Sequence, residues 1–304
     1  MASDRVNLKP FFPERRWLRF ALPAIVLIMG LMVTVPGYAS DPITFSLLTQ
    51  SDTTYSLPHD IVLSPDASAL YVADNGNHRI VILDPGSLKE IGVFGRDEVR
   101  EPHDVAFDRM GRLLVADTGN SRIAVFNVRG NSGKLVNEIK GGIRRPEGVA
   151  VHPDGRVFAT GAASGNLVVY EKGKVVGEAG GFSSPHNVEL GPDGTIWVAD
   201  AGNDRMVQLD KDLQIISVLK GSEYEFNGPR YHDFDTGGRM LVADKNSNQI
   251  KVIARDGTLI QVLGTKGRGM GEGLFNQPEG VEILGDRVWF SDTYNNRIVL
   301  YRMQ

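Results

Sequence analysis

Six repeats of one pattern, each with four short apolar runs, predict an all-β chain folded as a single six-bladed β-propeller. The runs are bounded by clusters of Gly, Pro, Asn and Asp, which is typical of strands and not of helices. Each repeat begins at a Pro-x pair, and the second members of these pairs lie roughly 39 to 47 residues apart, the length of a four-stranded propeller blade. These second members are His59, His103, Glu147, His186 and Glu279, and in the fifth repeat the degenerate start Pro229-Arg230-Tyr231-His232 assigns the position to His232.

The four strands of a repeat follow one another in a fixed order. A Pro-Asp or Pro-Asp-Gly turn separates the first strand from the second, and a polar D-x-x-N-x-R-I turn separates the second from the third. In the first repeat the expected strands are 61–63, 70–73, 80–83 and 91–94. The sixth repeat ends after its third strand, so we expect the isolated run 43–48 to supply the fourth and close the ring.

The composition is that of a packed globular chain. Hydrophobic residues make up 41% and charged residues 23% of the 304 residues. The net charge of −4 provides no basic surface, which argues against a nucleic-acid partner. Cysteine is absent, so disulfides, thiolate metal ligands and a cysteine nucleophile are excluded.

Residues 1–39 have a different composition and are typical of a targeting segment. Basic residues up to Arg19 precede an uncharged apolar run over 20–35, and small residues lead to a cleavage site after Ala39. This pattern predicts a secretory signal peptide, with an uncleaved membrane anchor as the alternative because the run falls just short of about 20 residues. In both cases the propeller, residues 40–304, is expected outside the cytoplasm, periplasmic or secreted, and contacts a membrane only through this segment.

The Pro-x pairs indicate where the chemistry lies. The first strand of a blade is innermost, so the six second members are expected to meet at one mouth of the central channel. Imidazole is the commonest transition-metal ligand, and carboxylates join it at zinc and iron sites. His59, His103, Glu147, His186, His232 and Glu279 therefore predict a divalent metal site, zinc first, with iron or calcium as alternatives. The other interpretation is a set of polar residues that line a wet channel.

Two further sets of polar residues have structural explanations. The Asp of each D-x-x-N-x-R-I turn is expected to accept hydrogen bonds from turn amides or to pair with the Arg of its own blade. A second set directly follows the histidines and either orients the imidazoles or bonds backbone between blades. That set is Asp60, Asp104, Asn187 and Asp233.

The repeats resemble NHL repeats over nearly all of the chain from Leu57 to Tyr301. The D-x-x-N-x-R-I signature begins at Asp74, Asp117, Asp200 and Asp292. The third repeat departs from it, and the fifth has Gln249 in place of the Arg. The resemblance implies a propeller, and NHL propellers often bind a peptide, a glycan or a protein partner.

A narrower resemblance comes from the Pro-His starts and from the stretch FNQPEGVEI…SDTYNNRIVLY. Both look like peptidyl-α-hydroxyglycine α-amidating lyase, a zinc-dependent propeller that cleaves the N–Cα bond of a hydroxyglycine peptide. The resemblance implies that His59 and His232 hold zinc, that Tyr294 takes the substrate hydroxyl proton and that Arg79 is an active-site residue. The third ligand position of that family falls at Glu147, and the histidines of the second and fourth repeats have no counterpart there.

Two functions follow from these patterns. The first is a metal-dependent carbon–nitrogen lyase that acts on a small molecule or peptide; streptogramin lyases, also metal-dependent propellers with Pro-His-Gly starts, are similar. The second is a non-catalytic, monomeric propeller that binds a peptide, glycan or protein on the same face. Tightly bound metal distinguishes the two.

Overall fold

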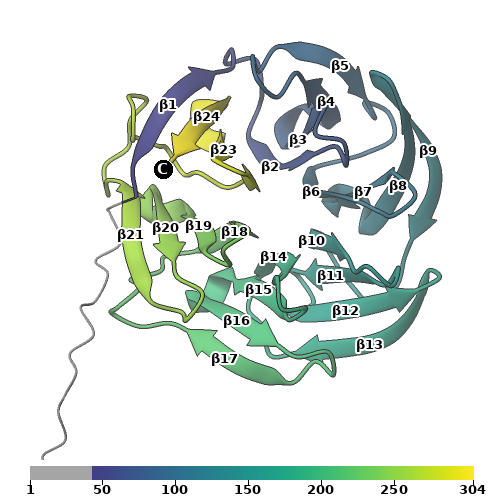
Figure 1. The fold of residues 1–304 in the computed structure, drawn as a ribbon. Helices are drawn as coiled ribbons and strands as arrows, with labels where there is room; N and C mark the ends of the chain where they lie inside the picture. The colour runs from purple at the N-terminus through teal and green to yellow at the C-terminus, as the bar shows by residue number, and fades with distance from the viewer. Residues whose placement is uncertain (1–42) are drawn as a thin grey trace, which may run out of the picture. The chain divides into compact units, whose positions relative to one another are not determined.

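The computed structural model describes residues 43–304, in which nearly every ordered element is a β-strand. These strands form six four-stranded antiparallel sheets arranged around a central axis (Figure 1). The predicted six-bladed propeller is therefore confirmed. The proposed signal segment lies outside the described residues, and within 43–304 no helix has the length and apolarity needed to cross a membrane.

The blades follow the chain order from the inside outward. Blade 1 contains β2 (Pro58–Leu63), β3 (Leu70–Asp74), β4 (Arg79–Leu83) and β5 (Glu90–Phe94). Blade 2 contains β6 (Pro102–Phe107), β7 (Arg112–Asp117), β8 (Arg122–Arg129) and β9 (Ser132–Ile139). Blade 3 contains β10 (Pro146–Val151), β11 (Val157–Gly161), β12 (Asn166–Glu171) and β13 (Lys174–Gly180).

The second half repeats this order. Blade 4 contains β14 (Pro185–Leu190), β15 (Ile196–Asp200), β16 (Arg205–Leu209) and β17 (Ile215–Leu219). Blade 5 contains β18 (Pro229–Phe234), β19 (Met240–Asp244), β20 (Gln249–Ile253) and β21 (Leu259–Gly264). Blade 6 contains β22 (Val281–Leu284), β23 (Arg287–Asp292), β24 (Arg297–Met303) and β1 (Phe45–Gln50).

The N-terminal strand closes the ring, as the sequence predicts. β1 pairs antiparallel with β24 and takes the outermost place in blade 6 (Figure 1). The backbone N–H groups of Thr44 and Gln304 each donate to the carbonyl of the other, at 2.7 and 3.0 Å. The strand begins at Phe45, two residues later than expected, and hides the edge that β24 would otherwise present.

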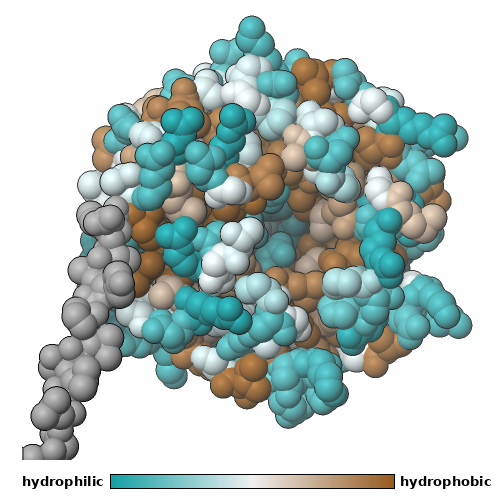
Figure 2. All heavy atoms as spheres, viewed as in Figure 1, coloured by the Kyte–Doolittle hydropathy of each residue, from teal (hydrophilic) through white to brown (hydrophobic). Residues whose placement is uncertain are grey.

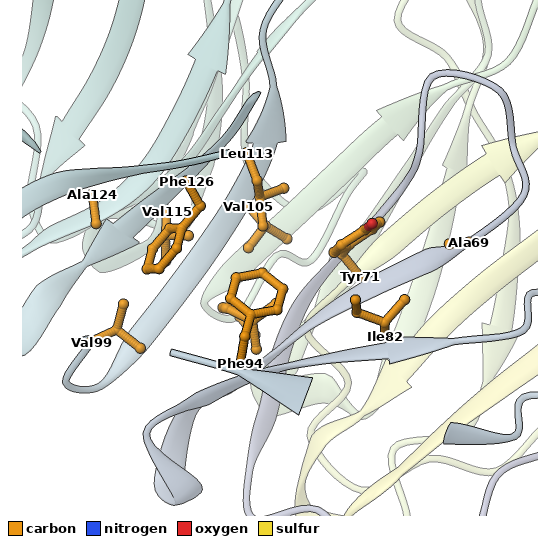
Figure 3. Close-up of a cluster of buried hydrophobic side chains, with 12 residues drawn as sticks. Ala69, Tyr71, Ile82, Phe94, Val99, Val105, Leu113, Val115, Ala124 and Phe126 are labelled. Atoms are coloured by element: carbon orange, nitrogen blue, oxygen red, sulfur yellow. The ribbon is translucent and has the colours of Figure 1, made fainter. Parts of the chain in front are cut away.

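The middle strands of a blade are buried on both faces, which explains their continuous apolar runs. In blade 1, Tyr71 and Ile82 pack against Val115 of blade 2, whereas Leu70 packs on the other face with Trp289 of blade 6. Figure 3 shows how side chains of blades 1 and 2 interlock in one such inter-blade core. Burial at about 25 cal/mol per Å² of apolar surface makes these cores the main stabilising contribution.

The turn between the second and third strands is a short 3₁₀ helix held by the signature Asp. In blade 1, Asp74 Oδ2 accepts from Arg79 Nε at 2.6 Å, and Asp74 Oδ1 accepts from the Ser56 amide at 2.8 Å. Asp117, Asp200 and Asp292 make the same two kinds of bond in their blades. The expectation for these carboxylates is confirmed, and each one fixes the loop that enters the innermost strand.

Blade 5 keeps the carboxylate but replaces its partner. Gln249 stands at the Arg position, and the buried Lys251 instead places its Nζ 2.7 Å from Asp244 Oδ2. The amide of Asn227 donates to Asp244 Oδ1 at 2.7 Å, as in the other blades. The loop before β18 is therefore anchored by a cation from a different position in the blade.

Candidate metal centre

A bulge at the start of the innermost strands directs side chains into the channel mouth. In blade 1 the register runs from Pro58 opposite Asp74 to Ile61 opposite Val72, so one extra residue lies on β2 between these pairs. The same shift occurs in blades 2, 4 and 5. Such bulges re-aim side chains and are frequent next to functional sites.

This register corrects one assignment made from the sequence. In blade 5 Pro229 lies opposite Asp244, so the second position belongs to Arg230 and not to His232. His232 lies opposite Val242, in the place that Ile61 has in blade 1. It is buried with both ring nitrogens unpartnered, and burial lowers its pKa to about 3. The intervening Arg and Tyr made a Pro-x-x-His segment look like a degenerate Pro-His start.

Three histidines of the predicted set do converge. His59, His103 and His186, from blades 1, 2 and 4, have ligand nitrogens within 4.8 Å of one another. The ring centroid of His103 lies 4.4 Å from that of His59 and 5.6 Å from that of His186. Burial lowers the pKa values of His103 and His186 well below the ordinary value, so both rings are neutral at physiological pH. Neutral imidazoles are the form that binds a metal ion.

Both predicted glutamates flank these rings. Glu279 Oε2 lies 2.9 Å from His59 Nδ1 and 3.8 Å from His186 Nε2, and Lys245 Nζ lies 2.7 Å from its other oxygen. Glu147 Oε2 lies 3.3 Å from His186 Nε2. The cluster is thus three imidazoles and two carboxylates within a few ångströms.

The two glutamates differ in electrostatic setting. Burial alone raises the pKa of Glu279, but His59, Lys245 and His186 outweigh it, and the pKa lies well below its ordinary value. Burial raises the pKa of Glu147, and the nearby charge of Arg230 only partly opposes that rise. Glu279 is therefore the charged member of the pair, and Glu147 is the one suited to hold a proton.

Tyr231 contacts the histidine cluster and was missed by the sequence reasoning. Its hydroxyl lies 2.9 Å from the carbonyl of His103 and 3.2 Å from that of Glu147, and it donates to these oxygens of blades 2 and 3. Its ring centroid lies 5.0 Å from that of His186. The phenol thus connects His103, Glu147 and His186 to blade 5. The signal for it was the break of the Pro-His-Asp pattern at Pro229.

Arg79 and Tyr294, the two non-ligand residues implied by the lyase resemblance, are not part of the histidine cluster. Arg79 donates to Asp74, as the arginines of blades 2, 4 and 6 do to their own aspartates. Tyr294 is 45% exposed on the 3₁₀ turn Thr293–Asn295 of blade 6. Lys245 Nζ lies 5.2 Å from the centre of the Tyr294 ring and also contacts Glu279, which links this tyrosine to the rim of the cluster.

The polar residues that directly follow the four histidines bond the backbone of the next blade. Asp104 Oδ2 accepts from the Val149 amide at 2.9 Å, and Asp233 Oδ2 accepts from the Ile283 amide at 2.7 Å. Asp60 and Asn187 accept longer bonds, of 3.4 Å, from the amides of Val105 and His232. Of the two uses left open by the sequence, the structure shows the inter-blade one.

The innermost strands also carry a set of buried carboxylates. Burial, with repulsion from neighbouring carboxylates, raises the pKa values of Asp60, Glu189 and Glu282 well above the ordinary range. Burial also raises the pKa values of Asp104 and Asp233 to about 7. Figure 2, in the view of Figure 1, shows a hollow near the middle of the face with hydrophilic residues at its bottom.

By fold this chain is a six-bladed β-propeller, and two of its segments match the NHL repeat. The NHL repeat pattern matches residues 55–83 and 100–126, which hold the inner strands of blades 1 and 2. No curated protein sequence matches the chain significantly.

Three solved structures of the same fold each align with more than four fifths of this chain. A streptogramin B lyase is 16% identical with a TM-score of 0.60, covering 86% of this chain and 88% of its own. An inactive virginiamycin B lyase from Staphylococcus aureus with quinupristin is 13% identical with a TM-score of 0.61, covering 86% and 99%. The hydrazine synthase of Kuenenia stuttgartiensis is 14% identical with a TM-score of 0.61, covering 82% and 96%. At these identities the likeness establishes the fold alone.

Proposed function

We propose that this chain is a metal-dependent lyase whose single divalent ion is held by His59, His103 and His186. The observation that carries the proposal is the convergence of three buried imidazole nitrogens within 4.8 Å. A tetrahedral zinc ion needs ligand nitrogens about 3.3 Å apart, so modest closure of the rings would complete the site. Three nitrogen ligands favour zinc or iron over calcium, which prefers oxygen.

The donor set fits such an ion. His59 Nδ1 lies 2.9 Å and His186 Nε2 lies 3.8 Å from Glu279 Oε2, and His103 Nε2 lies 3.9 Å from Glu147 Oε1. Imidazole nitrogens and carboxylate oxygens are the donors that zinc and iron bind, so an ion among these atoms would meet a suitable ligand set. Lyases are among the proteins of similar fold, which supports this class of reaction without establishing it.

The chain's own residues suggest how bond cleavage proceeds. A bound divalent ion supplies Lewis-acid polarisation of a substrate hydroxyl or carbonyl oxygen. For a hydroxyglycine peptide, the leading candidate substrate, Tyr294 in its phenolate form takes the hydroxyl proton, and the carbon–oxygen single bond becomes a carbonyl. The N–Cα bond then breaks, and the amide nitrogen takes a proton from Glu147, whose raised pKa favours the acid form. The products are an amide and glyoxylate.

We place this activity outside the cytoplasm on the basis of the predicted signal segment. We also propose that the chain acts as a monomer. The alternative function is a non-catalytic propeller that binds a peptide, glycan or protein at the same mouth. Elemental analysis of the chain, purified without a His tag and exposed to zinc, iron and calcium, decides between them.

We expect about one zinc or iron ion per chain in the wild type, and loss of it in His59→Ala and His103→Ala, because each removes one of three ligands. His152→Ala is the matched control, since His152 lies in a surface turn with its Nδ1 2.8 Å from Asp154 Oδ1. His232→Phe should also retain the metal, because His232 occupies a core position. A wild type that stays metal-free would reject the lyase and leave the mouth as a binding surface.

Release of glyoxylate from a hydroxyglycine peptide then tests the substrate. A metal-loaded chain that leaves this peptide intact would exclude the amidating reaction and direct the search to other lyase substrates.

A further inference from the structure

Blade 5 presents an arginine where the other five blades present histidine or glutamate. Arg230 occupies the second position of its blade, one residue after Pro229, which lies opposite Asp244. Its Nε is buried and has no hydrogen-bond partner. Glu147 and His186 occupy the same second position in blades 3 and 4, so Arg230 belongs to the same ring of residues.

Arg230 differs from the other cations at this mouth in having no carboxylate of its own. Lys245 Nζ lies 2.7 Å from Glu279 Oε1, and Arg145 lies 3.4 Å from Glu101 Oε2. Within residues 43–304, Arg230 is in no ion pair. Arg230 is half-buried, and a buried Nε donor without a partner is costly unless an acceptor such as an anion completes it.

The balance of charge at the mouth also calls for an anion. Glu101 is paired with Arg145 and Glu279 with Lys245, so Arg230 and an added divalent ion leave a positive excess whether or not Glu147 holds its proton. Two carboxylates already beside the histidines disfavour a highly charged ligand such as a phosphate dianion. A monoanion with a planar, two-oxygen face matches the fork of a guanidinium.

We propose that Arg230 is the carboxylate-binding residue of this centre and that the natural substrate carries a carboxylate beside its reacting group. This inference rests on the proposed metal centre, because it places the carboxylate next to a metal-bound atom. Arg230 would then select acids over the corresponding neutral amides and orient them toward His186 and Glu147. In this role it takes the place of a ligand residue and determines specificity.

The test is calorimetric titration of the zinc-loaded full chain with N-acetylglycine and with N-acetylglycinamide, which differ in the carboxylate and lack a reactive hydroxyl. We expect the wild type to bind the acid at least about tenfold more tightly than the amide. Arg230→Gln should remove that preference, and Arg230→Lys should restore part of it by charge without the fork. Zinc content and thermal unfolding are measured on each variant, and Arg287→Gln, which replaces the exposed first residue of β23, is the control.

The outcomes separate this inference from the proposed function. Equal acid and amide binding by zinc-loaded wild type, or an unchanged preference in folded Arg230→Gln, overturns the role of Arg230 and leaves the metal centre standing. A wild type that takes up no metal overturns the lyase. The same titration on metal-free protein then decides the arginine, since an acid preference lost in Arg230→Gln supports it and no preference rejects it.

Discussion

At the scale of single residues, the mouth depends on how side chains from opposite blades meet. Tyr231 reaches from blade 5 to the carbonyls of His103 and Glu147, and its ring lies against His186. It touches three members of the cluster and is a ligand to none. In metal sites, contacts of this kind hold the ligand rings in place, and removing one typically lowers metal affinity by about 10- to 100-fold.

We therefore expect Tyr231→Phe to weaken zinc binding by about tenfold and to lower the free energy of unfolding by about 1–2 kcal/mol. Competition with a chelator measures the first effect and urea unfolding the second. Tyr224→Phe is the control, because that hydroxyl donates at 2.7 Å to the Gly257 carbonyl, away from the mouth. Equal zinc affinity in the two variants would show that the Tyr231 hydroxyl does not position the histidines.

At the scale of the blade, the signature Asp connects three backbone segments. Asp200 is fully buried and accepts from the Ser183 amide at 2.7 Å, from Asn203 at 2.8 Å and from Arg205 at 2.6 Å. These bonds hold the entering loop, the 3₁₀ turn and the third strand together. In blade 5, Lys251 replaces the usual arginine at this point, so a cation from a different position pairs with the signature Asp.

Asp200→Ala should lower the free energy of unfolding by about 2–4 kcal/mol, because it leaves a buried amide and Arg205 without their acceptor. Urea unfolding followed by circular dichroism measures the change. Asp212→Ala removes an exposed carboxylate paired only with Lys211 and should change stability by less than about 0.5 kcal/mol. Similar values for both variants would contradict a structural role of the signature Asp.

At the scale of the whole molecule, carboxylates hydrogen-bonded across blade boundaries join the ring and make its stability depend on pH. Burial raises the pKa of Asp233 to about 7, whereas an unfolded Asp titrates near 3.9. The folded state then binds more protons than the unfolded state between about pH 4 and 7. The contribution of Asp233 to stability is therefore full at the acid end of this window and is lost as the pH rises through 7.

Asp233→Asn should remove this dependence while its amide oxygen still accepts from Ile283. Between pH 4.5 and 8 we expect the variant to gain about 1–3 kcal/mol in unfolding free energy relative to wild type. Burial shifts His103 and His186 in the opposite sense, but both proteins carry them, so their effect cancels in the difference. Urea unfolding across this range measures it, and parallel pH profiles would place the proton elsewhere.

The repeat pattern by itself determined the number of blades, the order of their strands and the closing role of the N-terminal run. These features depend on local turn residues and on apolar runs that are buried wherever blades pack, and both are visible in the letters. The repeat pattern also predicted a cluster that contains five of the six proposed second-position residues. Equivalent positions in a closed ring face one axis, so these residues meet there.

Only the tertiary structure decided the register at Pro229 and the contacts made across the channel. A bulge adds one residue to a strand and leaves no mark in the sequence. Spacing alone therefore could not decide whether Arg230 or His232 occupies the second position of blade 5. The reach of Tyr231 to blades 2 and 3 and the bonds of Asp104 and Asp233 to the next blade join residues distant in sequence. Such contacts arise when the ring closes, and no short stretch of the chain encodes them.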